Sequence, residues 1–122
     1  MSGGRTNKIQ FARFRAAAEH WIEVFGLFDW DLEFLHEKLE NKYASVHYDY
    51  ATRKASLVLS TSFGKWPITE ERIQDSALHE VLHLLLADLS GFAEAAAAER
   101  RVTEAEHIII NRIKAALNRA HG

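Results

Sequence analysis

The segment ALHEVLHLLLADL, residues 77 to 89, restricts the fold of this chain more than any other. Its apolar side chains occupy nearly every side of a helix, so a helix at this place has to be buried among other elements. Thr69 is a suitable N-cap, and the two glutamates that follow it stand where the helix dipole favours acidic side chains. We therefore predict a central buried helix from Thr69 to about Leu89, with Gly91 just beyond its end.

Two histidines and a glutamate interrupt this apolar helix. His79 and His83 are four positions apart, so their Cβ atoms lie on one face at roughly 5–6 Å and both imidazoles can bind one ion. Glu80 lies further round the helix, where it is poorly placed as a ligand but can take a proton from a metal-held water molecule. We predict a Zn²⁺ site with His79 and His83 as ligands and Glu80 as general base. Histidines of the core, satisfied by hydrogen bonds, are the alternative.

A third ligand is expected from the segment TEAEHIIINRI, residues 103 to 113, because a catalytic zinc usually has three protein ligands. The chain has no cysteine, so these ligands have to be His, Asp or Glu. An apolar stripe runs along the helix through Val102, Ile109, Ile110, Ile113 and Leu117. Glu106 falls at its centre, and His107 falls at its edge, about 100° away. We predict Glu106 as the third ligand, with His107 as the alternative; without a metal, Glu106 would pair with Arg112 or Arg13.

The segments before the central helix predict a small sheet. They alternate or are rich in aromatic and β-branched residues, and they lie at residues 30 to 36, 43 to 50 and 55 to 61. The short polar stretch ATRK joins the last two and favours a hairpin. We therefore expect three strands in a mostly antiparallel sheet.

Two further helices complete the expected architecture. An amphipathic helix runs from Asn7 to about Phe25, and a last helix begins at residue 93 or at residue 102 and ends near Arg119. The order helix, three strands, helix, helix is typical of an α+β domain in two layers.

Length and composition limit the possible classes of protein. The 122 residues suit one domain, residues 1 to 122, with a flexible lead at residues 1 to 6. The formal charge is −2 and the basic residues are scattered, so no nucleic-acid partner is expected. No apolar run is long enough to cross a bilayer and no signal-peptide pattern is present, so we expect a cytoplasmic protein that does not bind a membrane. The oligomeric state is left open.

The motif HEVLH on a buried helix, followed 23 positions after His83 by Glu106 on a second helix, resembles the zincin metallopeptidases with a glutamate ligand, the gluzincins. The small size is similar to that of minimal metallopeptidases encoded by bacteriophages and prophages. The resemblance implies that His79, His83 and Glu106 bind zinc, that Glu80 polarises the catalytic water, and that a peptide or protein substrate aligns along an edge strand. We expect residues 55 to 61 to form that strand.

The chain also departs from the gluzincin pattern. It is too short for a second subdomain, and Ile110 stands where some members have an acidic residue that orients a zinc-bound histidine. Asp75, one turn before His79, or Asn111 could supply that contact instead. A zinc-stabilised binding or regulatory module with little or no turnover is therefore the alternative function, and a metal-free helical adaptor is a third.

Overall fold

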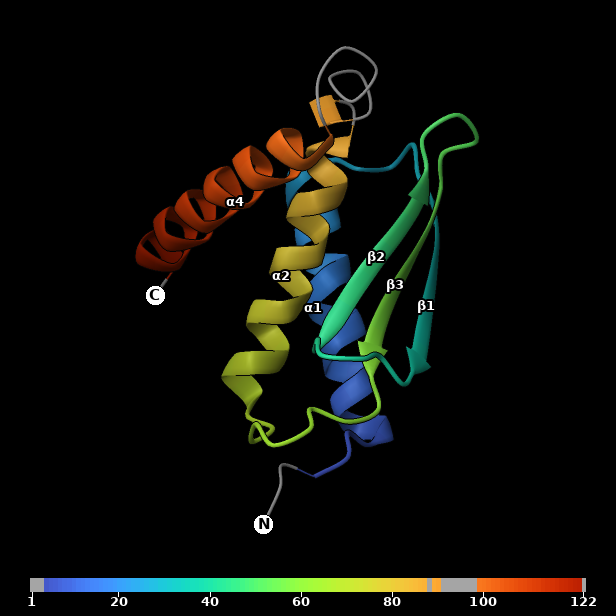
Figure 1. Ribbon diagram of the computed structural model, residues 1–122, viewed down its shortest axis with the longest axis vertical. Helices are drawn as coiled ribbons and strands as arrows, with labels where there is room; N and C mark the ends of the chain where they lie inside the picture. The colour runs from blue at the N-terminus through green and yellow to red at the C-terminus, as the bar shows by residue number, and fades with distance from the viewer. Residues whose placement is uncertain (1–3, 88, 91–98, 122) are drawn as a thin grey trace.

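The computed structural model describes residues 4–87, 89–90 and 99–121 of the chain. Its elements, in chain order, are α1 (Lys8–Phe25), β1 (Asp31–Glu37), β2 (Ala44–Asp49), β3 (Lys54–Ser60), α2 (Glu70–Leu85) and α4 (Glu99–His121). Figure 1 shows α1 and α2 beside the three-stranded sheet, while α4 leaves the far end of α2 and points away from the sheet. The predicted α+β class and the order of the elements are confirmed.

The sheet is mixed, not mostly antiparallel as predicted. Its strand order is β1-β3-β2, with β2 antiparallel and β1 parallel to β3. The predicted hairpin of β2 and β3 is confirmed, but β1 joins the opposite side of β3. The most deeply buried strand, β3, therefore takes the central position, because Leu57, Val58 and Leu59 need cover that an edge would not provide. The prediction of residues 55 to 61 as the substrate-aligning edge strand is wrong, and the strand beside α2 is β2.

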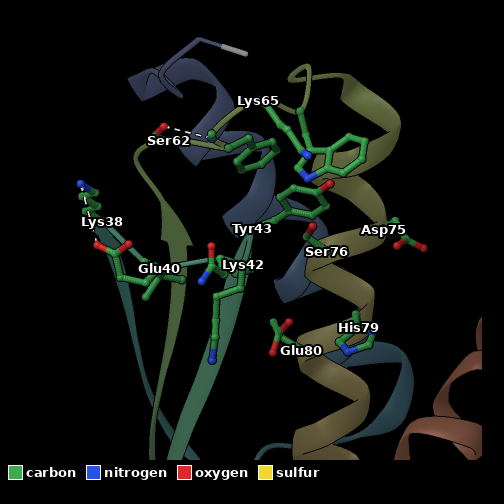
Figure 2. A pocket seen from close by; sticks show the side chains of 16 residues that line it. Lys38, Glu40, Lys42, Tyr43, Ser62, Lys65, Asp75, Ser76, His79 and Glu80 are labelled. Atoms are coloured by element: carbon green, nitrogen blue, oxygen red, sulfur yellow. Dashed lines mark hydrogen bonds and ion pairs between the residues drawn. The ribbon is translucent and has the colours of Figure 1, made fainter. Parts of the chain in front are cut away.

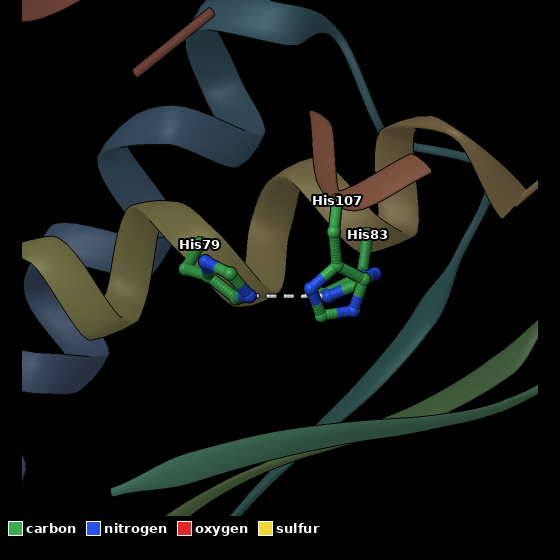
Figure 3. Close-up of side chains that lie close together, drawn as sticks. All are labelled: His79, His83 and His107. Atoms are coloured by element: carbon green, nitrogen blue, oxygen red, sulfur yellow. Dashed lines mark hydrogen bonds between the residues drawn. The ribbon is translucent and has the colours of Figure 1, made fainter. Parts of the chain in front are cut away.

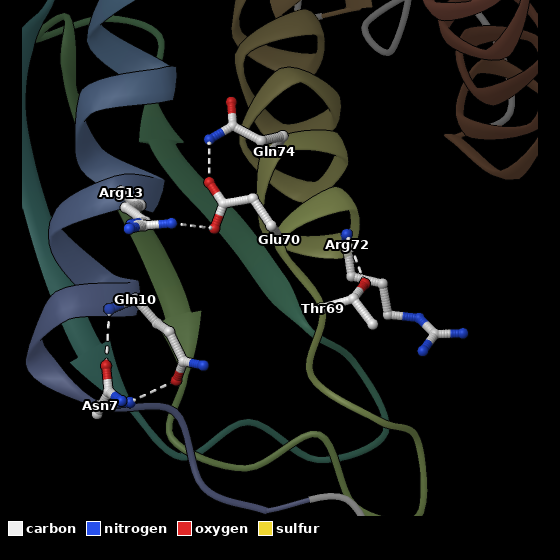
Figure 4. A network of polar contacts seen from close by, with 7 residues as sticks. All are labelled: Asn7, Gln10, Arg13, Thr69, Glu70, Arg72 and Gln74. Carbon is white, nitrogen blue, oxygen red and sulfur yellow. Dashed lines mark hydrogen bonds and ion pairs between the residues drawn. The ribbon is translucent and has the colours of Figure 1, made fainter.

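Helix α1 is defined by local signals at both ends, as predicted. Asn7 and Gln10 form a capping box in which each side chain accepts a hydrogen bond from the other's backbone amide, both at 2.8 Å (Figure 4). Gly26 ends the helix in the left-handed conformation, with φ 68°. The buried face of α1 packs on α2, so the first helix forms one wall of the core.

Helix α2 begins as predicted and ends earlier. The Thr69 hydroxyl accepts a hydrogen bond from the Arg72 amide at 3.1 Å (Figure 4). Helix α2 ends at Leu85 and Leu86 is a turn residue, but Ala87, Leu89 and Ser90 are again helical, so the helical stretch predicted to about Leu89 is interrupted at Leu86. The Ser90 amide then donates to the Leu86 carbonyl at 2.9 Å. The predicted terminal residue, Gly91, lies outside the described residues.

Helix α4 begins at Glu99, between the two predicted starts, and residues 93 to 98 lie outside the described residues. Its inward stripe passes through Glu106, Ile110, Ile113 and Leu117. Glu106 is buried as predicted, whereas Ile109 is 38% exposed, so its place in the predicted stripe is wrong. Contact with Leu78 and Leu82 of α2 fixes this rotation, because Ile110 packs between them and the rest of the stripe.

The chain before α1 contacts the sheet through Thr6. Of the predicted lead, residues 1 to 3 lie outside the described residues, and Thr6 is buried, with its hydroxyl 2.6 Å from His36 Nε2 and 2.7 Å from the Ser60 carbonyl. Among the described residues, no helix is both long and apolar enough to cross a membrane.

Candidate metal centre

Three histidine rings meet where α4 crosses α2. His79 and His83 project from one face of α2, and His107 reaches them from α4 (Figure 3). The ring centroids lie 4.9 Å apart for His79 and His83, 4.7 Å for His83 and His107, and 5.6 Å for His79 and His107. His79 and His83 therefore share one face of α2, as predicted. His107, the alternative third ligand in the sequence analysis, lies next to them.

The ring nitrogens have the spacing that a small metal ion needs. One ligand atom from each of the three histidines lies within 4.8 Å of the others. The Nε2 atoms of His79 and His83 are 3.2 Å apart. In a tetrahedral site with Zn–N bonds of about 2.0–2.1 Å, two ligand nitrogens lie roughly 3.3 Å apart. The His79–His83 pair therefore has the spacing of two zinc ligands, and His107 offers a third imidazole nitrogen within 4.8 Å of them.

Glu106 lies against His83 and not in the middle of the three rings. Its Oε1 atom contacts His83 Nδ1, and its Oε2 atom accepts a hydrogen bond from the Ser90 hydroxyl. Its partners are therefore His83 and Ser90, while Arg13, one of the two arginines predicted to pair with it in the absence of a metal, pairs with Glu70. Both carboxylate oxygens of this buried residue are engaged by side chains of the protein.

The Glu80 side chain points from α2 toward the sheet (Figure 2). It is only 7% exposed, and this burial raises the pKa of its carboxyl to about 7, although the charges of Lys42 and Lys114 oppose the rise. Figure 2 shows the carboxylate in the space between α2 and the Lys42 side chain. The predicted base is therefore a shielded carboxyl group beside the histidines.

Burial affects His79 in the opposite direction. The pKa of its imidazole falls to about 4, first because of burial and then because of the charges of His83, Lys114 and His107. A neutral imidazole is the form that binds a metal. At neutral pH, His79 therefore offers a free nitrogen lone pair.

Two adjoining cavities follow α2 past these residues. A cavity of about 380 Å³ lies over the histidines and Glu106 and is bordered by β2, and a second of about 860 Å³ continues toward Trp66. Lys42, Ala44, His79 and Glu80 line both cavities (Figure 2). The candidate centre thus stands at the junction of a continuous cleft whose size is typical of ligand sites.

Three further side chains that line the cavities have partners within the protein. Tyr43 packs on Phe63 at 4.6 Å between ring centroids, and Tyr48 packs on Trp30 at 5.8 Å. Asp75 accepts a hydrogen bond from Lys114 at 2.7 Å, so it ties α2 to α4.

Two residues that the sequence did not single out border the centre. Ser90 contacts Glu106, and Lys42 lines the cleft opposite Glu80. No local pattern marks Ser90, because the turn at Leu86 brings it to α4. Lys42 precedes β2, and only the placement of that strand beside α2 brings it to the cleft.

Comparison of the chain with protein-family models, with curated proteins and with solved structures finds no significant match. The centre has five groups that can take part in chemistry. These are two histidines on one helix turn, a buried carboxyl beside them, and a histidine and a carboxylate from a second helix.

Proposed function

We propose that this chain is a zinc-dependent metallopeptidase in which His79 and His83 hold the metal and Glu80 is the general base. The observation that carries the proposal is the convergence of the His79 and His83 Nε2 atoms, 3.2 Å apart, beside a buried glutamate of the same helix turn. Helix α4 contributes the remaining protein ligand. These groups border a cleft, which favours a catalytic centre over a purely structural one.

Each side chain has a defined task in the proposed reaction. When bound, zinc would polarise the scissile carbonyl and lower the pKa of a water molecule. The Glu80 carboxylate takes the proton from the attacking water and returns it to the leaving amine. Its burial keeps bulk solvent away from this transfer. His79 and His83 serve as neutral ligands whose common helix fixes their separation.

An extended peptide is the class of substrate that suits the cleft. Strand β2 borders the cavity over the histidines, and it pairs with β3 on one side only among the described strands. Its free edge offers backbone groups with which a peptide can pair. The substrate-aligning role that the sequence predicted for residues 55 to 61 therefore passes to β2.

Replacing Glu80 by glutamine tests this function. Glu80→Gln keeps the shape of the side chain but removes the base, so peptide cleavage should fall by roughly 10²–10⁴-fold while zinc content stays the same. Glu71→Gln, in the exposed first turn of the same helix, is the matched control and should cleave like the parent. Cleavage is measured on a broad peptide mixture by mass spectrometry. Equal cleavage by Glu80→Gln and the parent would refute the base assignment.

A zinc-stabilised binding module is the second candidate function. It is favoured by one observation: the three histidines of the group are joined by Glu106, whose Oε1 atom contacts His83, so a fourth protein ligand stands close enough to close a tetrahedral sphere if its side chain turns. In that case the parent binds zinc tightly and cleaves no component of the peptide mixture. If the protein binds no zinc at all, both candidates fail and a metal-free adaptor remains.

A further inference from the structure

Both carboxylate oxygens of Glu106 are already engaged by side chains of the protein. Oε1 contacts His83 Nδ1 and Oε2 accepts the Ser90 hydroxyl hydrogen bond. Ser90 is 3% exposed and Glu106 is 8% exposed, and the His83 side chain is 17% exposed, so this contact is shielded from solvent. A metal bond to Glu106 would therefore have to share an oxygen with one of these contacts, or displace it, inside a buried contact between helices.

The contact with Glu106 also determines how His83 presents its ring. A carboxylate only accepts hydrogen bonds, so the imidazole proton of His83 lies on Nδ1. Its Nε2 atom therefore carries a lone pair, and this atom is the one that lies 3.2 Å from His79 Nε2. The nitrogen that His83 turns toward the other histidines is thus the one that can bind a metal. Carboxylate–histidine pairs of this kind fix the orientation of metal-bound rings.

His107, and not Glu106, belongs with His79 and His83 to the group of converging ligand atoms. Adjacent helix residues point about 100° apart, so α4 can direct Glu106 into the contact with α2 and His107 over the cleft. The His107 ring lies 4.7 Å from His83 and 5.6 Å from His79, between centroids. Its donor atom belongs to the group in which all ligand atoms lie within 4.8 Å of each other.

We infer that His107 is the third metal ligand and that Glu106 is a positioning residue, held by Ser90, which orients His83. This inference rests on the proposed metal centre and deepens it. The ligand set is then three neutral imidazoles, so the metal keeps its full charge and one tetrahedral position stays open. The residue that the sequence favoured as a ligand acts through its neighbour instead.

Metal titrations of the purified chain separate the two roles without any assay of activity. Zn²⁺ affinity is measured by competition with a chelator, and Co²⁺ is added as a probe because its visible spectrum reports the ligands bound to it. His107→Ala should lower zinc affinity by more than about 100-fold and change the cobalt spectrum. Glu106→Gln should lower affinity by about 10–100-fold and leave the cobalt spectrum as in the parent.

Two further variants serve as controls. His47→Ala removes a histidine that lines the same cavity outside the group of three, and it should bind both metals like the parent. Ser90→Ala should weaken zinc binding in the same direction as Glu106→Gln, again without a change in the cobalt spectrum. Circular dichroism checks that each variant is folded, and His107→Ala is the safest of them because His107 is exposed.

The inference is overturned if Glu106→Gln changes the cobalt spectrum, whether or not His107→Ala also changes it, since Glu106 then binds the metal itself. It is also overturned if His107→Ala binds zinc like the parent. The proposed function fails separately. If His107→Ala loses zinc but the zinc-loaded parent cleaves no peptide, the ligand set stands and the peptidase proposal falls.

Discussion

The two sides of helix α2 differ in what they pack against. Toward α1 and the sheet, α2 meets a continuous apolar core whose most buried members include Phe14, Leu57 and Ile73. Toward α4, only Leu78, Leu82 and Ile110 form the buried apolar contact among the described residues. Polar groups border that smaller contact, and they are the groups of the candidate metal centre. Burial of apolar surface therefore stabilises the packing of α2 on α1 and the sheet. Less apolar surface is buried between α2 and α4, so it holds α4 in place less strongly.

Truncating one buried residue on each side should give the largest effect and test this difference. Leu57→Ala in the central strand β3 removes a fully buried side chain, so unfolding free energy should fall by about 2–5 kcal/mol. Ile110→Ala in α4 should lower the global value by only about 1 kcal/mol, because α4 can detach before the core unfolds. Chemical denaturation measures the global value, and hydrogen exchange measures the protection of α4.

Ile108 lies two positions before Ile110 on α4 and is exposed, so it provides the control for this comparison. Ile108→Ala should leave both the denaturation midpoint and the exchange rates of α4 unchanged within error. A loss of global stability in Ile110→Ala as large as that in Leu57→Ala would show that α4 belongs to the same cooperative unit as the core.

Zinc should reduce the difference between the two sides. The proposed ligands come from α2 and α4, so metal binding joins the helices where apolar contact is smallest. At a free zinc concentration 100 times Kd, binding stabilises the folded state by about 2.7 kcal/mol. Hydrogen exchange with and without zinc should show the largest gain of protection in α4 and a smaller gain in α1. Equal gains in both helices, or none that a chelator reverses, would contradict the bridging role.

The sequence predicted the parts of the molecule that local patterns determine. The His79–His83 spacing, the start of α1 after Asn7, the cap at Thr69 and the burial of Glu106 all depend on periodicity or on neighbours along the chain. The parallel pairing of β1 with β3 was missed because strand order depends on contacts between distant segments. The partners of Glu106 were missed for the same reason, since the position of Ser90 depends on the turn after α2.

Two ion pairs, one on each side of α2, should give the smallest effects and a finer comparison. Arg13 and Glu70 tie α1 to α2 at 3.1 Å with both side chains about half exposed, whereas Lys114, which ties α4 to Asp75 at 2.7 Å, is 13% exposed. Arg13→Met should cost at most about 0.5 kcal/mol and Lys114→Met about 1 kcal/mol, since exposed pairs are weakened by solvent. Denaturation at low ionic strength measures both.

Acid should weaken the Arg13–Glu70 contribution in a definite direction. Hydrogen bonds from Gln74 and Arg13 hold the pKa of the Glu70 carboxyl below its ordinary value of 4.5. The folded state therefore binds fewer protons than the unfolded state in that range, so this contribution is fully present above pH 4.5 and is lost as the pH falls through the lowered pKa. The destabilisation caused by Arg13→Met should accordingly shrink between pH 7 and pH 3. A destabilisation that stays constant over this range would show that Arg13 acts through packing of its aliphatic stem and not through its charge.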